Sequence, residues 1–202
     1  MIPLSRIASA ASIAIVVLAA ACRPLPGTRQ PGRAVTQEIF WSSLQSLCGR
    51  AFSGTLTEGN AADSVFRREA LMMHVRECTP SVIRIPLHAG ADRSRTWVLT
   101  RTDAGLRLKH DHRHSDGTED RITQYGGDTR GNGIAKKQEF HADAHTASLI
   151  PAARTNVWTV EVVPNTLFVY ALRREGTDRR FRIDFDLTKP VQLPPPPWGA
   201  RP

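Results

Sequence analysis

This sequence lacks the motifs of several common enzyme classes. No Gly-x-Ser-x-Gly elbow occurs, which argues against a serine hydrolase of the α/β type. No pair of carboxylates has the character of a glycosidase site. Residues 126–133 are polar and glycine-rich like a calcium-binding loop, but the alternating carboxylates and the closing glutamate are missing. We interpret this segment as a hairpin loop, leave enzymatic activity open, and favour a non-enzymatic role.

The chain is basic but has no pattern typical of nucleic-acid binding. Its formal net charge is +8 at pH 7, which could favour anionic lipid or nucleic acid. The basic residues, such as Arg107, Lys109, Arg180 and Arg182, alternate with apolar positions, as they do on a solvated sheet face. No helix or loop gathers basic and aromatic residues together, so we expect no nucleic-acid partner.

A long apolar run occurs at the N-terminus. Residues 7–21 contain two serines and follow Arg6, a length too short for a confident membrane span but typical of a signal peptide. The segment Leu18-Ala19-Ala20-Ala21-Cys22 resembles the lipobox of bacterial lipoproteins, although that family prefers leucine where this chain has Ala19. The resemblance implies that residues 1–21 are a signal peptide and that Cys22 is acylated as the first mature residue. An ordinary cleaved signal with an incidental Cys22 is the alternative.

The lipobox resemblance also implies a location. Arg23 stands where an aspartate would retain a Gram-negative lipoprotein in the inner membrane. We therefore expect a cell-envelope protein that is lipid-anchored through Cys22, at the outer membrane and facing the periplasm. Residues 22–35 contain proline and glycine breaks and are interpreted as a lipidated tether. Residues 191–202 are a proline-rich tail, which we expect to be extended and to lie back on the barrel through Trp198.

Apart from Cys22, the chain contains two cysteines, Cys48 and Cys78. In an oxidising envelope, two thiols favour one disulfide, and two buried free thiols are the alternative. The bridge would close a loop of roughly 30 residues and stabilise the fold by about 3 kcal/mol in the chain-entropy model.

Between the tether and the tail, the pattern predicts one helix and a succession of strands. Thr36 can cap a helix over residues 37–47, and Gly49 would end it. Period-two alternation between turn residues predicts strands over residues 51–56, 70–77, 82–87, 95–101, 106–114, 121–125, 136–142, 157–163, 167–173 and 180–187. A helix over residues 63–76 competes with the second strand.

These elements predict a mainly β fold over residues 36–190: a single antiparallel meander barrel of about nine strands with a short N-terminal helix. The strand order resembles a calycin-type barrel, the class of lipocalins and nitrobindins. The lipocalin Gly-x-Trp signature is absent, since the first strand offers Phe52-Ser53-Gly54. No histidine follows His145, so the haem function of nitrobindins is not carried over. The chain also resembles a family of uncharacterised bacterial secreted proteins, which implies no activity.

The strand over residues 106–114 carries the strongest indication of a site. Leu106, Leu108, His110, His112 and His114 share one face, and charged residues occupy the other. Because the charged face needs water, we expect the leucines and all three histidines to point inward. The histidines, with Trp97, Tyr125 and Tyr170, would then line a small-ligand site inside the barrel. A hydrogen-bonded polar rim without a ligand is the plainer interpretation.

The same histidine row suggests a metal-dependent enzyme as an alternative function. Residues i and i+2 of a strand lie about 6.6 Å apart, so His110 and His112 could converge on one divalent transition metal. His141 and Asp143 are the natural suppliers of further ligands, and a metal-bound water would be the nucleophile. A structural or interaction lipoprotein without a ligand is the third hypothesis.

Overall fold

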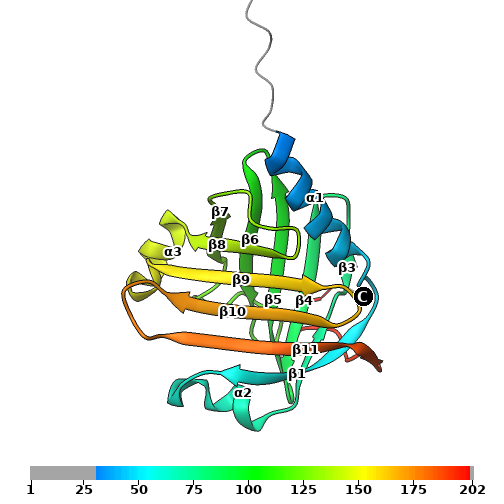
Figure 1. Ribbon diagram of the computed structural model, residues 1–202. Coiled ribbons are helices and arrows are strands. Elements are labelled where there is room, and N and C mark those ends of the chain that lie inside the picture. Colours follow the sequence, from blue (N-terminus) through cyan, green and yellow to red (C-terminus); the bar gives the residue numbers. More distant parts are fainter. Residues whose placement is uncertain (1–30, 201–202) are drawn as a thin grey trace, which may run out of the picture.

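The computed structural model describes residues 31–200. The expected signal peptide, Cys22 and the tether up to residue 30 therefore lie outside the described residues. Ten strands close into an antiparallel barrel, in which consecutive strands are neighbours and β1 pairs with both β2 and β11. β2 also pairs with β4 and bypasses the short β3, which lies outside the barrel. The predicted antiparallel meander barrel is confirmed, with ten strands in place of about nine (Figure 1).

The strands are β1 (Ala51–Glu58), β2 (Leu71–His74), β3 (Glu77–Cys78), β4 (Val82–Ala89), β5 (Asp92–Thr102), β6 (Gly105–His112), β7 (Tyr125–Thr129), β8 (Lys137–Ala142), β9 (Asn156–Val163), β10 (Leu167–Arg174) and β11 (Arg180–Val191). The α-helices are α1 (Pro31–Gln45), α2 (Ser64–Arg68) and α3 (Ala144–Leu149), and the 3-10 helices are η1 (Ala61–Asp63) and η2 (Pro151–Ala153). Within residues 31–200, no helix is long and apolar enough to cross a membrane.

Alternation along the strands sorts side chains between the core and the outer face. In β11, Phe181, Ile183, Phe185 and Leu187 are buried, while the arginines and aspartates between them are exposed or half-buried. Burial of each large apolar side chain contributes roughly 1.5–3 kcal/mol. β11 also closes the barrel by pairing with β1. A Cβ atom at Gly54 of β1 would lie 2.5 Å from the Phe185 ring, so glycine at this position leaves room for that ring.

Helix α1 closes one end of the barrel. Phe40, Trp41 and Leu44 are fully buried, and the helix packs against β6, β8 and β9. The helix begins at Pro31, before the predicted start, because proline is well tolerated in a first helical turn. The expected capping role of Thr36 is therefore wrong: its hydroxyl lies within the helix and donates to the carbonyl of Asn132 at 2.7 Å.

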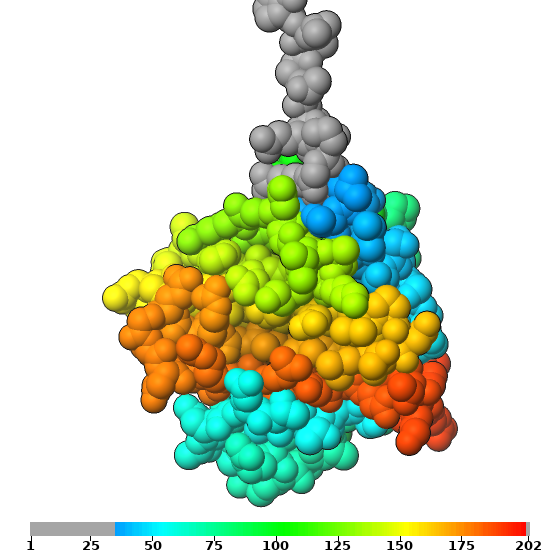
Figure 2. All heavy atoms as spheres, viewed as in Figure 1, coloured from blue at the N-terminus to red at the C-terminus, as the bar shows by residue number. Residues whose placement is uncertain are grey.

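The segment after β1 combines the two structures expected there. Residues of the predicted helix form the short α2, and residues of the predicted strand form β2 and then β3. In the space-filling view, β1 and α2 make the lowest part of the visible face, directly below β11 (Figure 2). The disulfide between Cys48 and Cys78 is present, with Cα atoms 6.3 Å apart, and ties the end of the helical segment to β3.

The predictions around β7 are wrong in two places. Of the strand expected over residues 121–125, only Tyr125 is in a strand, and the first four residues of the loop expected over 126–133 belong to the same strand, β7. A Cβ on Gly126 would lie 2.0 Å from the Leu108 carbonyl oxygen, and one on Gly127 would lie 1.7 Å from that of His141. These glycines therefore allow the backbones of β6 and β8 to approach β7 closely. Glycine has this role inside sheets, so its presence does not by itself indicate a turn.

Candidate functional site

A cavity of about 350 Å³ lies inside the barrel, at the end where α2, η2 and the β10–β11 turn gather. This end is distant from the N-terminal part of α1 (Figure 1). The residues that line it are Asp63, Phe66, Leu87, Arg95, Trp97, His110, His112, Tyr125, Ile150, Ala153, Asn156, Trp158, Tyr170, Leu172, Arg174, Arg179 and Phe181. Five of the six residues predicted for the ligand site line it: Trp97, His110, His112, Tyr125 and Tyr170.

The cavity wall is built from stacked rings. Trp97 and Tyr170 stack with their centroids 4.1 Å apart, and His110 stacks on Tyr125 at 4.4 Å with nearly parallel planes. Trp158 lies across His110 at 5.3 Å. These side chains come from β5, β6, β9 and β10 and from the first residue of β7, and alternation directs each of them inward. The wall therefore combines flat ring faces with the polar atoms of histidine, tyrosine, asparagine, aspartate and arginine side chains.

His110 is buried and held in one tautomer by its partners. Its Nδ1 lies 3.0 Å from the carbonyl oxygen of Tyr125, which can only accept, so Nδ1 carries the proton. The Tyr170 hydroxyl then donates to Nε2 at 2.6 Å. Burial lowers the pKa of His110 to about 3 and raises that of Tyr170. At neutral pH this pair is therefore uncharged.

His112 lies nearer the mouth and is half-buried. Its Nε2 is 3.1 Å from the Tyr125 hydroxyl. Burial, with a smaller contribution from Arg95, lowers the pKa of His112 to about 4, and burial raises the pKa of Tyr125 to about 12. Both histidines of the cavity are therefore neutral hydrogen-bonding groups at neutral pH.

The positive charge of the cavity comes from arginines at its mouth. Arg95 forms an ion pair with Asp92 and lies 5.1 Å over the Phe66 ring. Arg179 donates to both carboxylate oxygens of the buried Asp63, at 2.6 and 2.7 Å. Arg174 donates through Nε to the amide oxygen of Asn156 at 2.8 Å.

The expectation that His114 continues the inward row is wrong. β6 ends at His112, and the chain then turns through residues 115–117. The alternation of side chains holds only while the backbone stays in the sheet, so His114 is exposed and is not among the residues that line the cavity.

The four predicted metal ligands do not come together. His110 points into the barrel, whereas His141 alternates with the buried Phe140 and lies on the outer face of β8. Asp143 pairs with Lys109, also on the outer face. Within residues 31–200, no group of three or more histidine, cysteine, aspartate or glutamate side chains could hold a metal ion. The predicted arrangement is wrong for two reasons. β7 lies between β6, which carries His110 and His112, and β8, which carries His141. In addition, His110 and His112 line the interior of the barrel, whereas His141 and Asp143 lie on its outer face.

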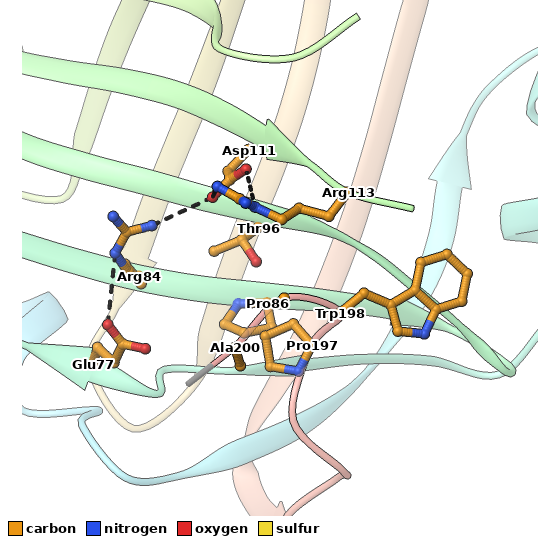
Figure 3. Close-up of a pocket in the computed structure, with 10 residues that line it drawn as sticks. Glu77, Arg84, Pro86, Thr96, Asp111, Arg113, Pro197, Trp198 and Ala200 are labelled. Carbon is orange, nitrogen blue, oxygen red and sulfur yellow. Dashed lines mark hydrogen bonds and ion pairs between the residues drawn. The ribbon is translucent and has the colours of Figure 1, made fainter. Parts of the chain in front are cut away.

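A second hollow lies on the outer face, under the proline-rich tail. Pro197 and Trp198 of the tail line this hollow with Pro86 and Thr96, and Figure 3 shows Pro197 next to Pro86 and the Trp198 ring directed away from it. The tail is held by the backbone N–H of Trp198, which donates to the Arg93 carbonyl at 3.1 Å. The charged groups in this hollow pair with one another, Arg84 with Glu77 and Asp111, and Arg113 with Asp111. Because these charges satisfy each other, the interior cavity is the stronger candidate.

Sequence reasoning missed the arginines of the cavity mouth and Trp158. Arg174 shares the inward face of β10 with Tyr170 and Leu172, and Arg95 shares that of β5 with Trp97. Arg95 already lies in the strand predicted over residues 95–101, two residues before Trp97, and Arg174 lies one residue beyond the strand predicted over 167–173, so alternation counted from Trp97 and Leu172 reaches both. Arg179 lies in a turn, where no periodicity applies.

The site supplies neutral hydrogen-bonding groups, aromatic faces and guanidinium groups. Its two tyrosines stay protonated and its two histidines stay neutral, and Asp63 is held by Arg179. This arrangement is suited to holding a molecule rather than to activating a nucleophile. Comparisons with protein-family models, curated proteins and solved structures find no match for this chain.

Proposed function

We propose that this protein is a lipid-anchored cell-envelope protein whose β-barrel binds a small molecule in the cavity behind His112. The observation that carries the proposal is the cavity itself. Ligand pockets have volumes of roughly 300–1,000 Å³ and combine apolar walls with a few placed polar groups. A volume of about 350 Å³ between Trp97, Trp158 and Tyr170 fits the small end of that range.

The arrangement of the histidines favours ligand binding over the metal-dependent alternative. Both ring nitrogens of His110 already have protein partners, and His112 contacts Tyr125. The rings therefore act as fixed parts of the wall. An open, ring-lined cavity also favours ligand binding over a purely structural role, for which a filled interior is sufficient.

The experiment uses the four tryptophans as reporters. Trp97 and Trp158 line the cavity, whereas Trp41 is a buried residue of α1 and Trp198 lies in the tail. Titration of the neutral aromatic probe 2-naphthamide into the full chain should shift the indole N–H resonances of Trp97 and Trp158 in a nitrogen–proton NMR spectrum. The resonances of Trp41 and Trp198 should stay in place. Single Trp→Phe variants assign the four signals.

A pair of neighbouring substitutions on β10 gives the control. Leu172→Trp places a large ring in the cavity and should weaken probe binding at least tenfold. Ala171→Trp adds the same ring on the outward side of the strand and should leave binding unchanged. Unmoved Trp97 and Trp158 resonances at the solubility limits of this probe and of its carboxylate analogue, 2-naphthoate, would refute the proposed function.

A further inference from the structure

We infer that the cavity is selective for a small, flat molecule that carries one carboxylate, and that Arg174 recognises that carboxylate. This inference rests on the proposed ligand-binding function and specifies the class of ligand. Arg174 is the last residue of β10, lines the cavity at its mouth and follows the inward-facing Tyr170 and Leu172 on the same strand face.

The charge balance at the mouth favours a single negative charge. Arg95, Arg174 and Arg179 line the cavity, and two of them have carboxylate partners, Asp92 and Asp63. The third, Arg174, has no ion pair among the described residues. Arg174 is therefore the one guanidinium among the lining residues without a carboxylate partner. The nearby histidines are neutral and do not change this balance.

The two terminal nitrogens of Arg174, which can bind a carboxylate, are not used in its hydrogen bond to the protein. Its Nε donates to Asn156, and within residues 31–200 its two terminal nitrogens have no hydrogen-bond partner. Asn156 is buried and fixes the guanidinium plane from the Nε side. A guanidinium presents parallel N–H groups that match the two oxygens of a carboxylate, an interaction stronger than that of a neutral pair.

The rings behind Arg174 select the rest of the ligand. Trp97 stacks on Tyr170 and His110 stacks on Tyr125, so flat surfaces flank the space behind the mouth. A flat apolar body can therefore lie among these rings while its carboxylate remains at Arg174. A second negative charge further inside would meet neutral groups only and would lose its hydration without compensation.

The test compares two probes of nearly the same shape, 2-naphthoate and 2-naphthamide, by calorimetric titration of the full chain. Wild-type protein should bind the carboxylate roughly tenfold more tightly than the amide, as expected for one charge-assisted hydrogen-bonded pair. Arg174→Gln should remove this preference, so that the variant binds the carboxylate and the amide with affinities within about twofold of each other. Arg173→Gln is the matched control, because Arg173 is the preceding residue on β10 and pairs with Glu139 and Glu175 on the outer face.

The outcomes separate the inference from the function on which it rests. If neither probe binds, the proposed function fails. If the amide binds and moves the Trp97 and Trp158 signals, but the carboxylate is not preferred or its preference survives Arg174→Gln, the inference is overturned and the function stands. An equal loss of carboxylate binding in Arg173→Gln would attribute the preference to general surface charge and also overturn the inference.

Discussion

At the scale of single residues, the two cavity histidines couple folding to pH. Their folded-state pKa values of about 3 and about 4 lie below the ordinary value of 6.5 because the rings are buried. In the unfolded chain both rings take up a proton near pH 6.5, while the folded protein stays neutral. The unfolded state therefore binds more protons between pH 6.5 and about 4, and the free energy of unfolding falls as the pH is lowered through this window.

We predict a measurable change in this pH dependence when either ring is removed. Each histidine contributes a slope that approaches roughly 1.4 kcal/mol per pH unit below its unfolded pKa. His110→Gln and His112→Gln should each reduce the slope of the unfolding free energy between pH 6.5 and 5, measured by urea denaturation. His114→Gln, which removes an exposed ring, serves as the control. Identical slopes in wild type and both cavity variants would contradict the assignment.

The site was predictable as far as strand alternation extends. Trp97, His110, His112 and Tyr170 follow from period two, because each of them lies within an observed strand. Tyr125 lines the cavity as the first residue of β7, although the strand expected over residues 121–125 does not form. His114 was misplaced because nothing in the sequence marks His112 as the last residue of β6. The partners of each ring depend on contacts between distant strands, such as His110 with Tyr170, and a single-strand pattern does not contain them.

At the scale of elements, β7 depends on glycines that leave no room for a side chain. Gly127 pairs with Ala142 of β8, and a Cβ there would overlap the backbone carbonyl of His141. Gly131 follows β7, and a Cβ there would meet nothing within 4 Å. Neither glycine has a positive φ, so alanine introduces no backbone strain at either position.

Gly127→Ala should therefore destabilise the barrel by about 3 kcal/mol, in the range of overpacking substitutions, because β7 must move away from β8. Gly131→Ala should change the unfolding free energy by less than about 0.5 kcal/mol, as is usual at open surface positions. Urea denaturation of both variants measures the difference. Equal urea midpoints for the two variants would contradict this prediction. They would show that β8 can move away from β7 without a loss in the free energy of unfolding.

The glycines also explain which elements the sequence predicted well. Strands with clean alternation, such as β9, β10 and β11, were found within a few residues of their observed ends. β7 was missed because Gly126 and Gly127 are typical of turns, and their use for close strand approach depends on β6 and β8, which come from elsewhere in the chain. α2 and β2 share a segment in which helical and strand patterns overlap, and the barrel closure between β2 and β4 decides the strand.

At the scale of the whole molecule, the chain joins the barrel at the end away from the cavity mouth. α1 begins at Pro31, and Thr36 and Glu38 near its start contact Asn132 and Arg101. Arg101 lies six residues after Arg95 on β5, and Arg95 is at the cavity mouth. The start of α1 and the mouth are therefore at opposite ends of β5. An anchor that precedes α1 would therefore leave the mouth open to solutes. The proposed lipid anchor and the proposed ligand site are compatible in one molecule.

The proposed lipid anchor at Cys22, which lies outside the described residues, can be tested in cells. In cells fed an alkyne-labelled palmitate analogue, wild-type protein should take up the label and sediment with the membranes. Its mass should be that of a lipidated chain whose first residue is Cys22. Cys22→Ser should lose the label and leave the membrane fraction, because acylation requires the thiol. A Cys48→Ser, Cys78→Ser double variant removes the disulfide thiols but should keep the label, which separates the roles of the three cysteines. Unlabelled wild-type protein would refute lipidation, and the barrel would then need another explanation for its place in the cell.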